Sequence, residues 1–515
     1  MTDPQRSHEP QDDVGDIDLT YPATPAAPAE TTPSGAARSP RTLKGAAIVS
    51  ARVVTGLIGV AVAAVVLAAT ILLPLPTLSL EPPAVVVTPV AAQQARVCPG
   101  PLLRLGDDTG AQATTASALG EATITSGASD GDIAETPARD VDGGEDTGEI
   151  VALAGSDEDA LLAASQSQSL SSGDFVGTAA AECLEPRDDT WLVGGATTTG
   201  RTSILTIVNP GEVAARVDIT VYSDAGAVSA PGTSGIAIPA GEQRVFSLAG
   251  LAPGLSSPVV RVQSQGALVV ATLQQSTVRT LEPGGLDFVT GPAEPSTELS
   301  IPGVILPDPE DIEDAISGED YLDLNPAIRM FVPGEAQAHA VVTMVPVTEE
   351  GESVEETPVD ISVTLDPGRV TELPVGGFEP GRYVASIASD VPIVAGVRVA
   401  TVASDGDNDF VWLPATQPLD DTALLAVARG ANPVLTLHNP GDEDADVVLT
   451  RGDAEAAVTV EAGSAVFVEV AQGGVYTLEG VDGMHASVGY LSAGTITAHS
   501  VSPRAPSSSP IVVYP

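Results

Sequence analysis

Short runs of alternating apolar and polar residues fill most of the chain after residue 190. Ser203–Val208 and Val217–Tyr222 are typical, and Pro-Gly and Ala-Gly pairs separate such runs. Alternation with a period of two predicts strands that bury one face, and the intervening pairs predict turns. Helical periodicity is nearly absent from this region. The sequence therefore predicts a mainly β fold.

The strand pattern recurs along the chain. Leu205–Gly211 returns as Leu435–Gly441, 230 residues later, and Ile328–Gly334 forms a weaker middle copy. Each copy continues with a turn and further strands. Copies of about 100 residues with six or seven strands each predict tandem immunoglobulin-like β-sandwich repeats. We expect these repeats at residues 188–287, 288–410 and 411–515.

The longest apolar run differs from these strands. Val53–Leu73 holds 21 residues without a charge or a proline. At about 1.5 Å per residue it spans about 31 Å, which is the thickness of a hydrocarbon core, so we expect a single transmembrane helix. A cleaved signal peptide is the alternative, but its apolar region is shorter and stands nearer the N-terminus. Four basic residues precede the run: Arg38, Arg41, Lys44 and Arg52. The positive-inside bias then places the N-terminus in the cytoplasm and the bulk after Pro74 outside it.

Two stretches contain few large apolar residues. They are the tail, residues 1–44, and residues 106–173, which are rich in Gly, Ala, Ser, Asp and Glu. Such segments bury too little surface to offset chain entropy, so both are expected to be disordered. Gly127–Gly131 matches the Gly-x-Ser-x-Gly nucleophile pattern, but that motif requires a preceding strand and a following helix, which we do not expect here.

The chain has two cysteines, Cys98 and Cys183, both beyond the predicted helix, where thiols are normally oxidised. We expect a disulfide between them. The bridge would close a loop of 85 residues (183 − 98). In the chain-entropy model, closing such a loop adds about 4 to 5 kcal/mol to the free energy of unfolding. The bridge brackets the acidic stretch, so residues 74–187 are expected to be an extracytoplasmic linker with an acidic loop closed by the disulfide. A redox-active pair is the alternative, but the Cys-x-x-Cys spacing is missing.

Charge narrows the possible partners and chemistries. The sequence has 21 Lys+Arg and 69 Asp+Glu, a formal net charge of -48. A surface of that sign repels phosphate backbones, so no nucleic-acid partner is expected. Lys44 is the only lysine. A P-loop, a Ser-x-x-Lys acyltransferase or a Schiff-base enzyme therefore cannot lie beyond it, and we expect no cofactor.

The remaining candidates for chemistry favour structural roles. Asp405–Asp409 begins like a calcium loop, but Phe410 and Thr416 stand where the motif needs glycine and glutamate. No metal site is expected, because four histidines lack ligand spacing. They are His339, His438, His485 and His499.

Two further pairs of residues occupy matching positions in the repeats. Asn209 and Asn439 precede Pro-Gly, and we expect their side chains to bond the nearby backbone of a turn. Trp191 and Trp412 stand at matching repeat starts. Because aromatic residues make up only 3% of the chain, we interpret both as core or interdomain wedges rather than ligand platforms.

Several of these features together resemble a known family. They are the anchor, the cysteine pair, Asp189–Ala196 with Gly200-Arg201 and Asn209-Pro210, and the strands Val259–Val262 and Ala267–Ala271. They resemble actinobacterial membrane-anchored envelope proteins of domain-of-unknown-function family 5719, from about residue 50 to the end. The resemblance implies a membrane-anchored extracytoplasmic protein without an established activity, and it supplies no catalytic residue.

These observations predict a non-catalytic, membrane-anchored extracytoplasmic scaffold or interaction protein of the bacterial cell envelope. Its expected partners are the membrane, through one helix, and an envelope protein or a cell-wall polymer. Two alternatives stay open: an envelope hydrolase that uses carboxylates or calcium, and a cell-wall glycan or adhesion module. A concave pocket with convergent carboxylates would favour the hydrolase, and flat sandwiches without a pocket would favour the scaffold.

Overall fold

A computed structural model describes residues 85–87, 94–106, 116–144, 147–154, 160–316, 318–349, 358–403, 406–504 and 511–513. Residues 84–515 form one compact unit. The predicted transmembrane helix, Val53–Leu73, and the predicted tail lie outside the described residues. Within the described ranges, no helix is long and apolar enough to cross a membrane.

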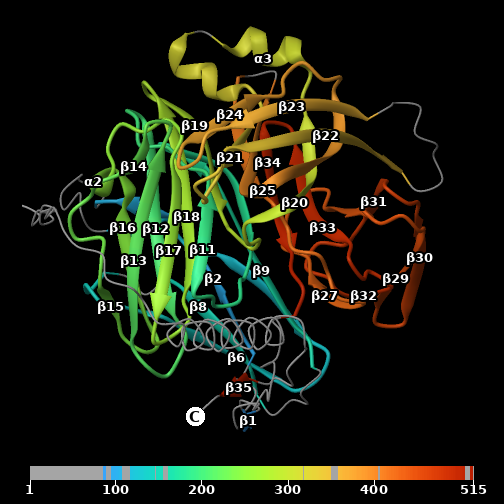
Figure 1. The fold of residues 1–515 in the computed structure, drawn as a ribbon, viewed down its shortest axis with the longest axis horizontal. Coiled ribbons are helices and arrows are strands. Elements are labelled where there is room, and N and C mark those ends of the chain that lie inside the picture. The colour runs from blue at the N-terminus through green and yellow to red at the C-terminus, as the bar shows by residue number, and fades with distance from the viewer. Residues whose placement is uncertain are drawn as a thin grey trace, which may run out of the picture. The chain divides into compact units, whose positions relative to one another are not determined.

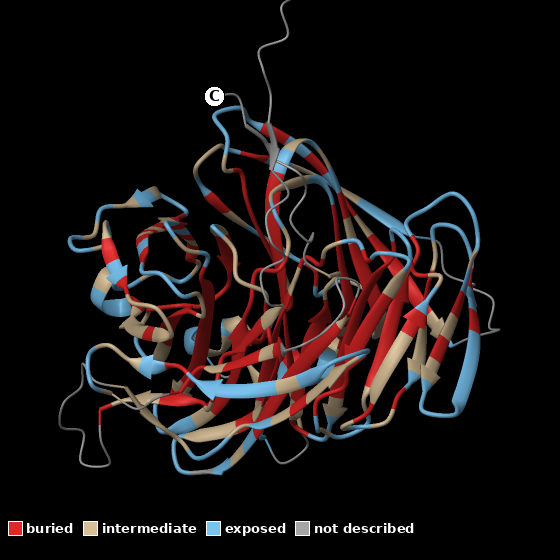
Figure 2. Ribbon diagram, turned by 90° about the horizontal axis from the view of Figure 1, so that it is seen from below, coloured by how far each residue is buried: buried red, intermediate tan, exposed pale blue. Residues whose placement is uncertain are grey.

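The described part of the chain is mainly β, which confirms the prediction from the alternating pattern. In strand β13 (Ala215–Ser223), Val217, Ile219 and Val221 are buried and the residues between them are more exposed. Side chains on one face of a strand recur at every second residue, so this pattern buries one face. Figure 2 shows buried residues running along the strands and exposed residues gathered in the turns.

The first of three β-sandwich-like units has two facing sheets. One has the strand order β11-β17-β13-β14, with β15 also paired to β13, and the other has the order β19-β18-β12-β16. Leu205, Val217 and Val260 are buried between them. The other elements of this sandwich are β11 (Asp189–Val193), β12 (Arg201–Asn209), β14 (Gly226–Val228), β15 (Ile236–Ile238), β16 (Glu242–Ser247), α2 (Leu248–Leu251), β17 (Val259–Gln265), β18 (Val270–Arg279) and β19 (Glu282–Val289).

The second sandwich is built on one long strand, β25 (Gly381–Val402), which belongs to both of its sheets. Its first half pairs with β20 and β22, and its second half pairs with β21 and β26. Asp308 caps the helix α3, which lies at the top of Figure 1. The elements are β20 (Ser296–Leu306), α3 (Pro309–Ala315), the 3-10 helix η1 (Glu319–Leu324), β21 (Ala327–Phe331), β22 (Ala338–Glu349), β23 (Val359–Leu365), β24 (Val370–Pro374) and β26 (Asn408–Pro414).

The third sandwich pairs the sheet β27-β32-β29-β30 with the strands β31-β28-β33-β34. Its elements are β27 (Thr422–Ala426), β28 (Val434–His438), β29 (Ala445–Arg451), β30 (Ala454–Val460), β31 (Ala465–Glu469), β32 (Val475–Glu479), β33 (His485–Ser492) and β34 (Thr495–Val501). Strand β22 of the second sandwich runs parallel to β31, and this contact joins the two sandwiches in a single 11-stranded sheet.

One strand lies on the other side of a repeat boundary from the expected one. Trp412 stands at the expected start of the third repeat, but its strand β26 pairs with β25 and completes the second sandwich. Strand β19, which contains Asp287, ends at Val289 and so extends the first sandwich two residues past its expected end. Strand pairing depends on partners far away in the sequence, which a local repeat does not display.

Strands replace much of the predicted disordered loop at residues 106–173. Strands β5, β9 and β10 form one sheet, and β2, β8 and β6 form another. Disorder is therefore a wrong prediction for the described residues of this range. The elements are β2 (Ala95–Cys98), β3 (Leu103–Leu105), β4 (Ala116–Ala118), β5 (Thr123–Ala128), β6 (Asp132–Pro137), β7 (Arg139–Asp140), β8 (Glu149–Ala154), β9 (Leu162–Ser172) and β10 (Phe175–Glu182), while β1 (Val85–Val87) pairs with β35 (Ile511–Val513).

The physical reason lies in the side chains of β9. Gln166 and Gln168 are buried, and their amide oxygens accept hydrogen bonds from the backbone N–H groups of Gly100 and Leu102 at 2.8 Å. Small and polar side chains give a stretch the composition of a disordered loop, yet its strands are held by such bonds and by packing against neighbouring sheets.

Four edge strands from three sheets meet in the middle of the unit. Strand β10 contacts β19, β19 contacts β26, β26 contacts β34, and β34 contacts β10. Asp409 on β26 is buried among them. Its carboxylate accepts one backbone hydrogen bond from each strand, donated by Thr178, Leu286, Phe410 and Ile496. One side chain thus joins edge strands of three sheets.

A second buried carboxylate, Asp287 on β19, lies beside it. It accepts hydrogen bonds from the N–H of Trp412 at 2.7 Å and from the hydroxyl of Thr497 at 3.1 Å. We call Asp287 and Asp409 the carboxylate junction. Burial raises the pKa of both carboxyl groups, that of Asp287 well above its ordinary value and that of Asp409 to about 7. A Cβ on Gly285 would lie 2.6 Å from Oδ1 of Asp409, so only glycine fits this approach.

Candidate functional site

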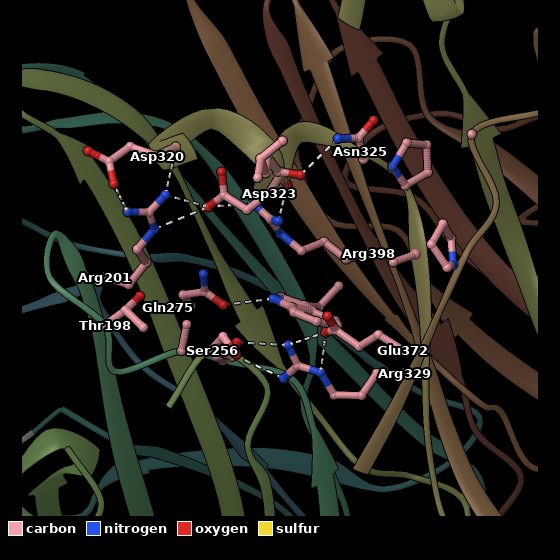
Figure 3. A pocket seen from close by; sticks show the side chains of 18 of the residues that line it. Thr198, Arg201, Ser256, Gln275, Asp320, Asp323, Asn325, Arg329, Glu372 and Arg398 are labelled. Atoms are coloured by element: carbon pink, nitrogen blue, oxygen red, sulfur yellow. Dashed lines mark hydrogen bonds and ion pairs between the residues drawn. The ribbon is translucent and has the colours of Figure 1, made fainter. Parts of the chain in front are cut away.

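A cavity of about 900 Å³ opens between the first and second sandwiches, bordered by η1. We call it the arginine cleft, because Arg201 of β12, Arg329 of β21 and Arg398 of β25 line it. Figure 3 shows two groups of polar contacts facing this cavity, one around Asp323 and the other around Arg329. Each group joins the first sandwich to the second.

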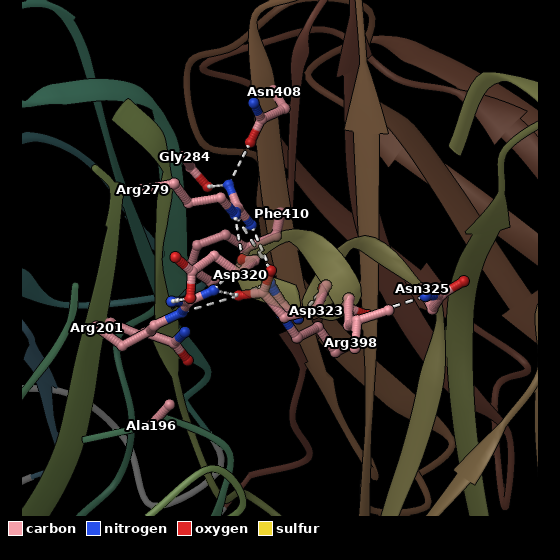
Figure 4. Close-up of polar contacts among 12 residues, drawn as sticks. Ala196, Arg201, Arg279, Gly284, Asp320, Asp323, Asn325, Arg398, Asn408 and Phe410 are labelled. Carbon is pink, nitrogen blue, oxygen red and sulfur yellow. Dashed lines mark hydrogen bonds and ion pairs between the residues drawn. The ribbon is translucent and has the colours of Figure 1, made fainter. Parts of the chain in front are cut away.

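The first group is centred on Asp323, at the end of η1. Arg201 donates to its Oδ2 from Nε at 3.2 Å and from Nη2 at 3.1 Å, and Arg279 donates to its Oδ1 from Nη2 at 2.6 Å. Arg398 donates from Nη1 to the backbone carbonyl of Asp323, and its Nη2 lies 3.4 Å from Oδ2. Figure 4 shows these three arginines directed at the one aspartate.

The second group is centred on Arg329. Its Nε and Nη2 donate to Oε1 of Glu372 on β24 at 2.9 and 2.8 Å. Its Nη1 crosses to the first sandwich and donates to the carbonyls of Gly195 at 3.0 Å and Pro258 at 2.8 Å. The guanidinium also stacks over Trp412, 4.6 Å from the ring centroid.

Burial and charge act against each other in the cleft. Burial lowers the pKa of Arg398 to about 10, although the carboxylate of Asp323 opposes that shift. Burial also lowers the pKa of Arg329. For Asp323 burial acts to raise the pKa, but the guanidiniums of Arg398 and Arg279 outweigh it, so its pKa lies below the ordinary value. Asp323 is therefore held as an anion.

Four carboxylates border the cleft, and their surroundings decide what they can do. They are Glu319, Asp320, Asp323 and Glu372. A general acid near neutral pH needs a raised pKa, whereas that of Asp323 is lowered. Glu372 is bound by Arg329, and Glu319 and Asp320 stand at the exposed rim. The geometry is suited to holding a charged ligand more than to moving protons.

The predicted disulfide is confirmed. Cys98 and Cys183 are bonded, and both are fully buried. The bridge joins the end of β2 to the residue after β10, beside the reciprocal backbone hydrogen bonds of Val97 and Leu184 at 2.8 and 2.9 Å. It lies outside the residues that line the arginine cleft.

The predicted turn and wedge residues behave as their sequence context indicates. Asn209 donates to the carbonyl of Val213 at 2.8 Å and accepts from the N–H of Gly211 at 3.0 Å, and Asn439 makes the same contacts in the third sandwich. Trp191 is buried against Phe331 of the second sandwich, with ring centroids 5.5 Å apart. Trp412 is buried in the wall of the cleft.

The structure brings two of the histidines together, His438 and His485, whose ring centroids lie 6.3 Å apart on neighbouring strands. His438, His485 and His499 are buried and His339 is exposed. Within the part of the chain that the structure describes, no group of three or more His, Cys, Asp or Glu could hold a metal ion. In Asp405–Asp409, the first residue lies outside the described residues and the last belongs to the carboxylate junction.

The Gly-x-Ser-x-Gly match is not an active site. Its first two residues end β5 and β6 begins directly after it, so a strand leads into the match, contrary to the expectation, but a strand and not a helix follows it. The hydroxyl of Ser129 accepts a hydrogen bond from the N–H of Leu161 at 2.8 Å. The serine is thereby used to hold a neighbouring segment.

Sequence reasoning missed the arginine cleft entirely. Its charged residues come from β12, η1, β21, β24 and β25 and have no common spacing. The one available signal was the scarcity of basic residues. With 21 Lys+Arg in the whole sequence, an arginine inside a strand that is otherwise apolar, such as Arg329 or Arg398, stands out.

The fold and the cleft define a mainly β, multi-sheet protein with a cavity between two sandwiches. The chain belongs to the family of unknown function DUF5719, which it matches over residues 105–471. A search of curated proteins finds no match. Among solved structures, the FN1–FN3 domains of chicken CNTN1 match with 11% identity over 60% of this chain and 98% of that chain, at a TM-score of 0.08. A similarity at that level carries no argument about the fold or the function.

Proposed function

We propose that the protein is a non-catalytic scaffold or interaction protein of the bacterial cell envelope. In this proposal the apolar run Val53–Leu73 anchors it in the membrane, with the N-terminus in the cytoplasm and residues 74–515 outside, in an actinobacterial envelope. The immunoglobulin-like character of the sandwiches belongs to the same proposal.

The carboxylate junction is the observation that carries the scaffold function. Asp409 binds the backbone of four edge strands, which belong to three sheets, and Asp287 binds β26 and β34. Sandwiches tied in this way keep a fixed geometry. A scaffold presents surfaces at defined separations, which flexibly linked domains cannot do.

The hydrolase alternative rests on the carboxylates of the arginine cleft. Asp323 and Glu372 are bound by arginines, which leaves Glu319 and Asp320 at the rim as the candidates for acid or base. The adhesion alternative needs a ligand-binding surface, and the cleft is the feature that favours it.

Complementation of a strain that lacks the gene separates scaffold from hydrolase. The double variant Glu319→Gln and Asp320→Asn should restore growth and envelope integrity as well as the unaltered chain, because the junction is unchanged. A chain released from the membrane, with a cleavable signal peptide in place of residues 1–73, should fail to complement. Full activity of the released chain, together with failure of the double variant, would overturn the scaffold proposal.

A further inference from the structure

Two buried donors of the Arg398 guanidinium, Nε and Nη2, lack a hydrogen-bond partner among the described residues. The Arg398 side chain is 9% exposed, its Nη1 donates to the carbonyl of Asp323, and its Nη2 lies 3.4 Å from Oδ2 of the same residue. Buried donors without acceptors are costly, so a partner that supplies acceptors would be bound favourably.

These two nitrogens form the edge with which arginine holds two oxygens of one anion. In this chain, Nε and Nη2 of Arg261 bind both oxygens of Asp189 at 2.9 and 2.6 Å. Arg244 holds Asp142 in the same way at 3.2 and 3.0 Å. A carboxylate or a phosphate matches this fork, because its oxygens have the spacing of the two N–H groups.

The interior of the cleft carries more positive than negative charge. Beneath the rim, the guanidiniums of three lining arginines, Arg201, Arg329 and Arg398, face two carboxylates, those of Asp323 and Glu372. Arg279, which is not part of the lining, also binds Asp323. The carboxylates of Glu319 and Asp320 lie at the rim, and the side chain of Asp320 is 71% exposed, so water and salt screen it. A chain with a net charge of -48 thus has a local site for an anion.

The rest of the cavity indicates a larger ligand than an ion. A volume of about 900 Å³ lies within the range of about 300 to 1,000 Å³ that holds small organic ligands. Thr198, Ser256, Gln275 and Asn325 line it together with the charged groups. Neutral hydroxyl and amide groups of this kind are suited to hydroxyl groups of a ligand.

We propose that the arginine cleft binds an anionic saccharide, whose phosphate or carboxylate group is held by Arg398 and Arg201. Its hydroxyl groups meet the neutral polar side chains. Because Nε and Nη2 of Arg398 are buried, binding turns the Asp323 carboxylate toward Arg279, which already holds its other oxygen at 2.6 Å. The inference goes beyond the proposed function, since a scaffold needs no ligand in this cleft.

Isothermal titration calorimetry on the full chain in a non-ionic detergent tests the proposal, at fixed ionic strength. Glucose 6-phosphate and glucuronate present the two anions on a sugar, and glucose and inorganic phosphate separate the sugar from the charge. At least one anionic sugar should bind, and it should bind about tenfold or more tightly than either glucose or inorganic phosphate. Binding of glucose 6-phosphate would identify a phosphate as the anion, and binding of glucuronate would identify a carboxylate.

Three variants test the proposal: one should weaken binding, one should leave it unchanged as a control, and one should tighten it. Arg398→Gln should weaken binding about tenfold or more, because it removes the charge and the fork. Arg244→Gln, an arginine of the same pairing geometry outside the cleft, should leave the affinity unchanged. Asp320→Asn removes a repelling charge at the exposed rim and should tighten binding about twofold or more.

Several outcomes would overturn the inference. They are the absence of heat with both anionic sugars, equal binding of glucose or of inorganic phosphate, and an unchanged affinity in folded Arg398→Gln. If that variant fails to fold, Asp320→Asn decides, and an affinity that does not rise contradicts the proposal. Binding in vitro does not depend on the compartment, so the scaffold proposal can fail in complementation while this one stands.

Discussion

Asp287 and Asp409 each bind the strand that carries the other. Oδ2 of Asp287 accepts a hydrogen bond from the N–H of Trp412 at 2.7 Å, and Oδ1 of Asp409 accepts one from the N–H of Leu286 at 3.1 Å. The two residues stand at matching positions of β19 and β26, the last strands of the first and second sandwiches. The exchange holds the two sandwiches together through polar contacts that are hidden from water.

Asp287→Asn should stabilise the protein above neutral pH. An asparagine can accept from the N–H of Trp412 with its oxygen and donate to the hydroxyl of Thr497 with its nitrogen, without a buried charge. We expect a gain of about 1 to 2 kcal/mol in the free energy of unfolding at pH 8, measured by urea denaturation.

Asp409→Asn provides the matched contrast. Both oxygens of Asp409 accept from backbone N–H groups, so the amide nitrogen of asparagine would face two donors. The loss of two acceptors should cost about 2 to 5 kcal/mol. Equal effects of the two substitutions would contradict the junction as described.

Unfolding free energy should fall as the pH falls from about 6.5 to 4. Burial lowers the pKa of His438, His485 and His499 to about 4, so in this window the unfolded chain binds protons that the folded chain does not. Each histidine contributes up to about 1.4 kcal/mol per pH unit. His438→Gln should reduce the slope of unfolding free energy against pH by the contribution of one histidine. Urea denaturation at several pH values measures this slope.

Asp409 changes the pH dependence of the unfolding free energy in the opposite direction to the histidines. Its folded pKa of about 7 exceeds the ordinary 3.8, so its stabilising contribution is fully present below pH 3.8 and is lost as the pH rises through 7. Asp287 acts with the same sign. Stability should therefore be greatest near pH 6.5, and a steady increase to pH 8 would contradict these assignments.

Replacing both cysteines by alanine should lower the free energy of unfolding by about 3 to 5 kcal/mol, because the bridge restricts a loop of 85 residues in the unfolded chain. The backbone bonds between Val97 and Leu184 should keep the native geometry. Mass spectrometry without a reductant should find Cys98 joined to Cys183. Free thiols in protein isolated from its own envelope would count against the bridge.

The two tryptophans should respond differently to replacement by phenylalanine. Nε1 of Trp412 donates to Oε1 of Gln275 at 2.9 Å, whereas Nε1 of Trp191 is buried without a hydrogen bond among the described residues. Trp412→Phe should therefore cost about 1 to 2 kcal/mol more than Trp191→Phe. Thermal unfolding monitored by circular dichroism measures both, and an inverted order would refute this account.

Residues 188–515 expressed alone should aggregate, while residues 84–515 should be soluble and β-rich. Removing the first segment uncovers Leu286 and Phe288, which pack against Leu102, Ala179 and Ala181. It also removes the N–H of Thr178 from Asp409. Size-exclusion chromatography and circular dichroism would test this, and a folded, monomeric 188–515 would show that the three sandwiches do not need the strands of residues 94–182.

What the sequence predicts well is local. Alternating residues identify the strands, Asn209 and Asn439 identify two turns, and Cys98 and Cys183 identify the bridge, because each signal lies in a short segment or in the scarcity of a residue type. The carboxylate junction could not be predicted in the same way. Asp287 and Asp409 look like surface carboxylates beside an apolar run, and only the pairing of distant strands buries them.

The arginine cleft shows the same limit for function. Arg201, Asp323, Arg329, Glu372 and Arg398 are spread over about 200 residues, and no short motif joins them. Their meeting depends on how two sandwiches pack, which is decided by buried contacts such as that of Trp191 with Phe331. The prediction of disorder for the acidic segment, residues 106–173, was wrong for a related reason. Its strands consist mostly of small and polar residues, and contacts with distant segments hold them in place.

The parallel contact of β22 with β31 has a consequence for how such a chain can evolve. Arrays of separate modules lengthen or shorten by gaining or losing one copy, because each copy leaves its neighbours intact. Here Val347–Glu349 hydrogen-bonds into the sheet of the next sandwich. Loss of one copy would leave an unpaired strand edge in the other, so a change in the number of copies should cost this chain more stability than it costs an array of separate modules.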